Sequence, residues 1–287
     1  MNTSHPPVSE PTRSYSNRDQ QAGAGFSQVD LLTVIVVLVL LALLLTPALA
    51  RTRVSDQAFQ CRNNLRQLLH GWRMYVEDNS GNLCDSFSWV RNGSEYSVMN
   101  YDVNNQSNTN ISYLLNGLLG PYVKNAAVYK CPADQSQALE GGVKLPRVRT
   151  YSMSQAFSLP NEGWLEDSPS PPNYWRHYVK SADMVLPAPA NLWVMICENP
   201  DSVNDAAFAV AMRGNNPGTD TWQDGPGNYH EGGCGFSFAD GHAEIHKWTD
   251  ARTLALTVTY AQTFSHGIGQ PNNIDIQWVK DRTTAQR

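Results

Sequence analysis

The chain has little charge and no cluster of basic residues. Only 16% of its 287 residues are charged, and 21 Lys and Arg stand against 26 Asp and Glu, which gives a net charge of −5. A nucleic-acid-binding domain usually carries a basic patch on one face. We therefore expect no nucleic-acid partner.

The sequence also lacks the short motifs of the common hydrolases. It contains neither G-x-S-x-G nor H-E-x-x-H, the motifs that place a serine nucleophile or a catalytic zinc ion. We therefore expect a protein that is not an enzyme. A secreted enzyme with an unfamiliar site stays open as an alternative.

Five cysteines are present, and no two of them form a C-x-x-C pair. This spacing argues against a zinc ribbon and against a thioredoxin-type redox site. An odd number leaves at least one thiol free or bonded to another chain. We prefer a disulfide between Cys61 and Cys131, with free thiols or pairings to Cys84, Cys197 or Cys234 as the alternatives.

What the sequence does have is one long apolar run. No charged residue occurs from Leu31 to Ala50, and a helix needs about 20 such residues to cross about 30 Å of hydrocarbon. We therefore predict a transmembrane helix. Asp30 directly precedes the run, and Pro47, near its end, is expected to kink or locally melt the helix.

Two ways of processing this N-terminus are compatible with the residues. The small-residue triplet Ala-Leu-Ala at 48–50 would suit a secretory signal peptidase, which would remove the apolar run. Cleavage between Gly25 and Phe26 would keep it. Arg51 and three further arginines follow the run while two precede it, and this bias alone places the body in the cytoplasm.

The segment 25–49, GFSQVDLLTVIVVLVLLALLLTPAL, resembles the N-terminus of type IV prepilins and type II secretion pseudopilins. The resemblance implies that a prepilin peptidase cuts after Gly25 and methylates the new N-terminal Phe26. It also implies a role in assembly for Pro47 and for Asp30, which stands at the mature position where the family usually has Glu. The resemblance favours the second way of processing and a body outside the cytoplasm.

The carboxylate of Asp30 has two candidate roles. In a helical filament, the acid of one subunit can pair with the new α-amino group of a neighbouring subunit, and this pairing compensates a buried charge. Alternatively, the acid only caps the helix, because a negative charge complements the positive end of the helix dipole. The resemblance favours the assembly role.

The helix is expected to continue beyond the apolar run as an amphipathic segment. Apolar residues recur at spacings of three and four up to Tyr75, and EDNSGN at 77–82 is a stop signal. We therefore expect four regions. These are a leader (1–25), a transmembrane and assembly helix (26–50), an amphipathic continuation (51–78) and a globular head (79–287).

The head is expected to be α+β. RTYSMS (149–154) and NLWVMICENP (191–200) have the composition of strands, and the second is apolar enough to be central. The resemblance implies a pilin-like fold, in which a long N-terminal helix, first transmembrane and then amphipathic, packs on a C-terminal antiparallel β-sheet.

The clearest local prediction is a hairpin closed by Asp240-Gly241, a favoured two-residue turn. It would set Phe238 opposite Ala243 and so form an apolar face. The opposite, polar face would carry His242, Glu244 and His246.

A second resemblance covers this end of the chain. His230, nine further residues and then Asp240-Gly241 match the H-x9-DG pattern of large prepilin-type proteins of planctomycete- and verrucomicrobia-like bacteria. The blocks QCRNNLRQLLHGWRMYVEDNSG, YKCPAD, ENPDSVND and FADGHAEIHKW resemble the same group, in the same order. The resemblance thus spans most of the chain and places an H-x9-DG region at 230–248.

Two groups of side chains are candidate cation sites. Near the hairpin, imidazoles and carboxylates could gather to bind zinc or another transition metal. In the loop ENPDSVND, oxygen ligands would suit calcium, which the resemblance to pseudopilins also suggests. A solvated strand face and a plain polar turn are the alternatives. The hairpin group is His230, Asp240, His242 and His246, and the loop group is Glu198 and Asp201.

Together these features predict a pilin- or pseudopilin-like subunit. The resemblance implies a prepilin peptidase and N-methyltransferase as partner, and an inner-membrane, single-pass protein with its head in the periplasm or extracytoplasmic space. It also implies assembly with copies of itself or other pseudopilins into a type IV pilus or a type II secretion pseudopilus. The alternative is a membrane-anchored or secreted extracytoplasmic binding module for carbohydrate or metal. Apart from calcium or another metal, we expect no cofactor.

Overall fold

The structure is a computed structural model of the chain, which divides into two compact units, Met1–Leu49 and Ala50–Arg287. The side chains of residues 44–53 and 95–96 lie outside the description. The described residues are 27–93, 95–96, 99, 105–160, 165, 174–212, 216–261 and 264–287.

Helix α1 (Gln28–Asp78) begins at a reciprocal N-cap. The N–H and Oγ of Ser27 donate to Asp30 Oδ2 at 2.9 and 2.8 Å, and the N–H of Asp30 donates to Ser27 Oγ at 3.2 Å. These bonds satisfy backbone donors that the first turn of a helix leaves unpaired. The helix is continuous through residue 47, so Pro47 does not melt it locally, and the kink that the sequence offers as the other outcome stays a prediction.

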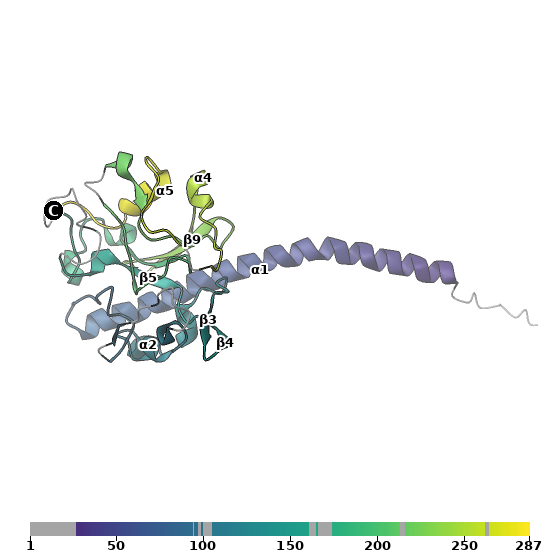
Figure 1. Ribbon diagram of the computed structural model, residues 1–287, viewed down its shortest axis with the longest axis horizontal. Coiled ribbons are helices and arrows are strands. Elements are labelled where there is room, and N and C mark those ends of the chain that lie inside the picture. Colours follow the sequence, from purple (N-terminus) through teal and green to yellow (C-terminus); the bar gives the residue numbers. More distant parts are fainter. Residues whose placement is uncertain are drawn as a thin grey trace, which may run out of the picture. The chain divides into compact units, whose positions relative to one another are not determined.

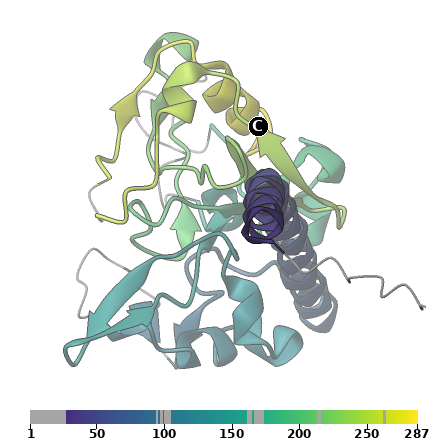
Figure 2. The same cartoon turned by 90° about the vertical axis from the view of Figure 1, so that its right-hand side faces the viewer.

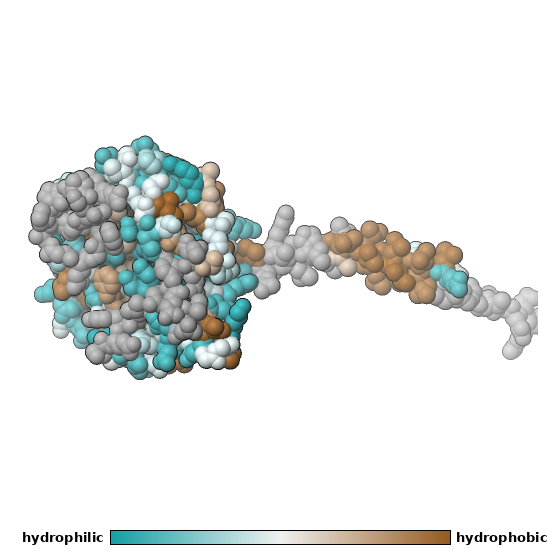
Figure 3. Space-filling view, viewed as in Figure 1, coloured by the Kyte–Doolittle hydropathy of each residue, from teal (hydrophilic) through white to brown (hydrophobic). Residues whose placement is uncertain are grey.

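The first unit exposes a continuous apolar surface on α1. The large apolar side chains from Leu31 to Leu43 are between 46% and 64% exposed, and they form the brown surface of the helix in Figure 3. Val, Ile and Leu alternate there without any charged residue, so apolar side chains occupy all sides of the helix.

Across the part of the chain that the structure describes, no helix combines the length and the apolar character needed to cross a membrane. This finding overturns the predicted transmembrane helix, and with it the predicted inner-membrane, single-pass localisation.

In the second unit, α1 is held by one row of buried apolar side chains along the helix. Leu65 and Leu68 are fully buried, and Trp72 is 2% exposed. Their spacing of three and four places them on one side of the helix. The helix ends where Ser80 and Gly81 take left-handed φ values of 55° and 80°, with the N–H of Gly81 donating to the carbonyl of residue 76 at 2.9 Å.

A five-stranded sheet forms the core of the second unit, so the architecture is α+β. The strand order is β10-β9-β6-β5-β7. Strands β5 and β6 confirm the two strands that the sequence predicts, and β6 lies in the middle of the sheet. The strands are β5 (Tyr151–Ser154), β6 (Trp193–Cys197), β7 (Ala207–Phe208), β9 (Gly233–Phe238) and β10 (Ala243–Lys247).

The sheet is mixed, so the predicted antiparallel sheet is wrong. Strand β7 runs parallel to β5, with Met153 opposite Ala207, while the other neighbouring strands are antiparallel. The reason lies in the strand order. Both sides of β6 are already paired, so β7, which follows it in the chain, takes the open edge of β5.

The predicted hairpin forms, but its register differs by one residue. Ser237 lies opposite Ala243, and Phe236 lies opposite Glu244. The prediction set Ser237 opposite Glu244. Opposed residues share a face of the sheet, so this shift moves the even-numbered residues of β10 onto the face that carries Phe236.

The loop explains the shift. The N–H of Phe238 donates to the carbonyl of His242 at 2.9 Å, and the N–H of Gly241 donates to the carbonyl of Phe238 at 2.9 Å. The loop therefore has three residues instead of two. Gly241 has a φ of +111°, which a residue with a Cβ rarely adopts.

Helices cover both faces of the sheet. A Cβ at Gly235 would lie 2.8 Å from Leu65 Cδ1 and 2.9 Å from Cys61 Sγ, so glycine is required where α1 packs on β9. The next side chain points to the other face. There the ring of Phe236 lies 5.1 Å from that of Trp278, in helix α5.

Smaller elements surround this core. In Figures 1 and 2, α2, β3 and β4 lie on one side of the second unit, and α4 and α5 lie on the other. Two-stranded sheets pair β1 with β2, β3 with β4 and β8 with β11. The helices are α2 (Ser112–Leu115), α3 (Gly120–Val123), α4 (Ala251–Leu254) and α5 (Ile274–Lys280), and the strands are β1 (Arg91–Asn92), β2 (Glu95–Tyr96), β3 (Gln137–Glu140), β4 (Val143–Pro146), β8 (Thr221–Trp222) and β11 (Ile268–Gly269).

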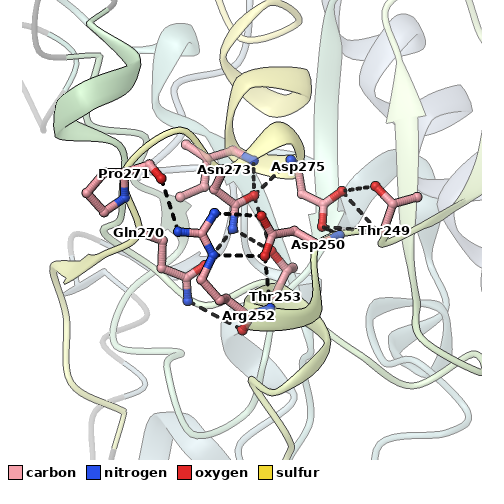
Figure 4. Close-up of polar contacts among 9 residues, drawn as sticks. Thr249, Asp250, Arg252, Thr253, Gln270, Pro271, Asn273 and Asp275 are labelled. Atoms are coloured by element: carbon pink, nitrogen blue, oxygen red, sulfur yellow. Dashed lines mark hydrogen bonds and ion pairs between the residues drawn. The ribbon is translucent and has the colours of Figure 1, made fainter.

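A polar network joins the starts of α4 and α5 (Figure 4). Asn273 Oδ1 accepts the N–H groups of Asp275 and Ile276 at 2.8 and 3.1 Å, which caps α5. The carboxylate of Asp275 accepts the N–H and Oγ1 of Thr249 and the N–H of Asp250 at 3.0 to 3.2 Å. The network therefore anchors α5 to the segment that follows β10.

Candidate functional site

Three buried side chains with metal-binding chemistry converge in the second unit. Cys61 comes from α1, Cys131 follows a 3-10 turn at Ala126–Tyr129, and His230 lies in the loop before β9. Their ligand atoms all lie within 4.8 Å of one another, and Cys131 Sγ is 3.4 Å from His230 Nε2. None of the three residues is more than 1% exposed.

Cys197, the last residue of β6, adds a third thiol to this group. It lies close enough to Cys61 and Cys131 to influence the pKa of both thiols, but its Sγ is not among the atoms that lie within 4.8 Å of one another. The hydroxyl oxygen of Tyr151 lies 3.4 Å from Cys61 Sγ. We call Cys61, Cys131, Cys197 and His230 the thiol–imidazole cluster.

The predicted disulfide between Cys61 and Cys131 is not formed. All five cysteines of the chain are free thiols. The sulfurs of Cys61 and Cys131 lie within 4.8 Å of each other, and Cys131 Sγ also lies 3.4 Å from His230 Nε2. The two sulfurs and the imidazole therefore form one group instead of an isolated pair.

The loop before β9 holds His230 in place. The N–H of His230 donates to the carbonyl of Gly233 at 3.3 Å, and its carbonyl accepts a hydrogen bond from Lys247 Nζ. Between them, Glu231 and Gly232 have left-handed φ values of 54° and 76°. This tight turn directs the imidazole into the core, where its Nδ1 has no hydrogen-bond partner among the described residues.

Burial and mutual hydrogen bonding separate the pKa values of the three thiols. Burial raises the pKa of Cys131 to about 11 and raises that of Cys197 well above its usual value. Burial acts in the same direction on Cys61, but hydrogen bonds from Cys131, Cys197 and Tyr151 outweigh it and hold its pKa well below the usual value. The cluster therefore favours one thiolate, at Cys61.

A cavity borders the cluster beside Cys131. Its volume is about 1040 Å³, and its walls come from α1 and from residues between Thr109 and Val148. Polar groups such as Asn64, Lys130 and Asp134 line it. The cavity gives a small ion or molecule a route to the edge of the cluster.

The structure places the two hairpin histidines away from His230 and against aromatic rings. The His246 ring stacks on Trp278 with centroids 3.6 Å apart, and the His242 ring stacks on Phe238 at 4.3 Å. Burial lowers the pKa of His246 to about 4. His246 is therefore a neutral aromatic packing residue at physiological pH.

The four side chains of the predicted hairpin metal site therefore do not come together. Asp240 Oδ1 accepts a hydrogen bond from His242 Nδ1 at 2.7 Å at the exposed turn, which occupies both groups. The shift of register turned His242 and His246 onto the aromatic face of the sheet. Of the predicted group, only His230 belongs to a cluster with metal-binding geometry among the described residues.

The predicted calcium ligands also have other partners. Glu198 is fully buried, and its Oε1 accepts a hydrogen bond from the hydroxyl of Ser202 at 2.9 Å. Asp201 Oδ2 accepts the N–H and Oγ1 of Thr259 at 2.7 and 2.8 Å. In the described part of the chain these two carboxylates join no group of three or more metal-ligating side chains, and the calcium site stays a prediction.

The predicted processing and assembly residues lie at the start of α1. Gly25 and Phe26 are outside the described residues, and so is the side chain of Pro47. Asp30 caps the helix, and hydrogen bonds from the backbone and then the side chain of Ser27 lower its pKa. The capping role is thus observed, and the assembly role stays a prediction.

The sequence indicated Cys197 only as an alternative disulfide partner and did not indicate Tyr151. Cys197 ends the most apolar strand, and Tyr151 begins its neighbour. Comparisons with known proteins found no matching family model, curated protein or solved structure. The residues themselves therefore carry the functional proposal.

Proposed function

We propose that this chain is a pilin- or pseudopilin-like subunit, which a prepilin peptidase processes and which assembles into a filament through its apolar N-terminal helix. The surface of α1 from Leu31 to Leu43 carries the proposal. Its large apolar side chains are all 46% or more exposed, and no charge interrupts them. An apolar surface of this extent requires apolar surroundings.

Copies of the same helix are the occupant that we propose for this surface. The apolar side chains cover all sides of the helix, whereas a simple dimer would bury only one side. In a helical filament, helices of several neighbouring subunits surround each helix. Complete burial of a Val, Leu or Ile side chain contributes about 1.5–3 kcal/mol, so the eleven such side chains from Leu31 to Leu43 favour association strongly.

The carboxylate of Asp30 is free to take part in this contact. Both hydrogen bonds that it accepts from Ser27 reach Oδ2, and Oδ1 accepts none from the described residues. The carboxylate is exposed and its lowered pKa keeps it ionised at neutral pH. It can therefore cap its own helix through one oxygen and accept the α-amino group of a neighbour through the other.

The position of the cap fits the proposed processing. Cleavage between Gly25 and Phe26 would leave one residue before Ser27, so the capping bonds would survive the cut. The new α-amino group would lie at the positive end of its own helix, where a positive charge is unfavourable. Pairing with an acid of a neighbouring subunit would offset that cost.

Co-expression of the full chain with a prepilin peptidase is expected to yield a product that begins at Phe26 and carries one added methyl group. Intact-mass measurement and N-terminal sequencing check this result. Gly25→Val should block the cut, and Gly23→Val, two residues earlier in the leader, should leave it unchanged. A mature chain that begins at Arg51 would contradict the proposal, because the apolar helix would then be discarded.

A further inference from the structure

We propose that the thiol–imidazole cluster is a structural zinc site. Cys61, Cys131 and His230 supply two sulfur ligands and one imidazole nitrogen within 4.8 Å of one another, and Cys197 offers a third sulfur beside them. All four residues are at most 1% exposed. Cys3His is one of the recurrent ligand sets of structural zinc, and soft thiolates select zinc over calcium or magnesium. This proposal concerns the second unit only and does not depend on filament assembly.

The distances suit a tetrahedral ion. Zinc binds sulfur at about 2.3 Å and nitrogen at about 2.0–2.1 Å, which sets neighbouring ligand atoms about 3.5–3.8 Å apart. Cys131 Sγ lies 3.4 Å from His230 Nε2, and the ligand atoms of Cys61, Cys131 and His230 lie within 4.8 Å of one another. These three ligand atoms therefore suit one ion, and a rotation of the Cys197 side chain toward it would supply the fourth ligand.

The four ligands come from four separate segments, which an ion would tie together. Cys61 belongs to α1, Cys197 ends the central strand β6, and Cys131 and His230 lie in loops. Binding would fix α1 to the sheet at the point where Gly235 brings the two closest. With four protein ligands and no exposed position, the site would be structural instead of catalytic.

The proposed site also gives a structural role to each part of the H-x9-DG pattern. His230 supplies the imidazole ligand, and Asp240-Gly241 closes the hairpin that returns the chain to it. Lys247, at the end of that hairpin, donates to the carbonyl of His230 through Nζ. The pattern therefore combines the ligand His230 with the turn that brings Lys247, which supports the loop of His230, back beside it.

The other buried cysteines show that the cluster is specific. Within the described part of the chain, the hydrogen bond of Cys84 Sγ goes to a neighbouring backbone carbonyl, that of Asp85, at 3.9 Å. Cys234 Sγ likewise donates to a carbonyl, that of Cys197, at 3.0 Å. Both are fully buried free thiols outside the cluster. Cys84→Ala is therefore a matched control for the removal of a ligand.

The test is the zinc content of the full chain, purified with a thiol reductant in a mild detergent that covers the apolar helix. Mass spectrometry of the metal should find about one zinc per chain. Cys131→Ala should lower this ratio by at least about tenfold, and Cys84→Ala should leave it unchanged. Because Cys131→Ala could unfold the head, circular dichroism of each variant accompanies the metal measurement.

A second measurement does not depend on a variant. The wild-type chain is stripped with a chelator and titrated with Co²⁺, which should produce the visible bands of a tetrahedral thiolate complex with an end point of about one ion per chain. Zinc should then abolish the bands. A folded wild-type chain that contains no zinc and gives no cobalt spectrum would overturn the proposal, as would a disulfide between Cys61 and Cys131 in peptide mapping.

Discussion

Replacing Val37 by arginine is expected to abolish filament assembly by the processed chain. Val37 lies in the middle of the apolar surface of α1 and is 48% exposed in the single chain. In a filament, the arginine would be placed among apolar helices without an acid to pair with. Burial of an unpaired charge costs several kcal/mol, so the critical concentration for assembly should rise at least about 100-fold.

Val143→Arg is the matched control for this prediction. Val143 lies at the start of β4 in the second unit and is 58% exposed, so the same substitution is made at a comparably exposed valine. Sedimentation and electron microscopy of the processed chains, with detergent removed, should find filaments for wild type and Val143→Arg but not for Val37→Arg. Filaments of unchanged abundance for Val37→Arg would contradict the proposed role of the helix.

Asp220→Asn is expected to lower the free energy of unfolding by about 3–5 kcal/mol, the largest stability effect that we predict. Asp220 Oδ1 and Lys280 Nζ lie 2.9 Å apart, and both side chains are 0% exposed. The variant leaves the buried ammonium group of Lys280 without a compensating charge. Urea unfolding of the full chain in detergent, followed by tryptophan fluorescence, measures the loss.

Two further variants separate the ion pair from other causes. Glu231→Gln makes the same acid-to-amide change in an exposed ion pair, in which Glu231 Oε2 lies 3.9 Å from Lys247 Nζ. This variant should lower the free energy of unfolding by at most about 1 kcal/mol. The double variant Asp220→Leu/Lys280→Met removes both buried charges and should recover most of the loss. A double variant as unstable as Asp220→Asn alone would show that packing, and not the unpaired charge, sets the cost.

The sequence predicts well those elements whose signal is local. In β5, Tyr151 and Met153 alternate with serines, whereas β6 is a short apolar run whose apolar content identifies its central place. The order of the strands in the sheet, in contrast, depends on segments that lie far apart in the sequence. Strand β7 lies beside β5 because β5 and β9 occupy both sides of β6. The residues of β7 alone give no sign of this arrangement.

The hairpin shows how a small local choice changes the interpretation of a site. Asp240-Gly241 fits both a two-residue and a three-residue loop. A two-residue type I′ turn would need a positive φ at both residues, and only Gly241 has one. The aromatic surface of Trp278, from an element later in the chain, then covers His246. A pattern of histidines at alternate positions thus predicted a metal site where packing produces a ring stack.

The thiol–imidazole cluster could not be predicted as a unit. Its members come from positions 61, 131, 197 and 230, so no spacing motif joins them, and only the packing of α1 on the sheet brings them together. Two signals did exist. Cys61 lies on the buried stripe of the helix, and Cys197 ends the most apolar strand, so both were expected to face the same core.

The most direct test of the proposed assembly is disulfide cross-linking of Leu38→Cys in the processed chain. Leu38 is 59% exposed on α1, whereas the five native cysteines are fully buried, so an oxidant meets one accessible thiol. We predict that most of the assembled chain becomes a covalent dimer, and that Val143→Cys, at a position of similar exposure on the head, does not. If Leu38→Cys stays monomeric, or cross-links no more than Val143→Cys, in samples that contain filaments, then the apolar helix is not the contact between subunits.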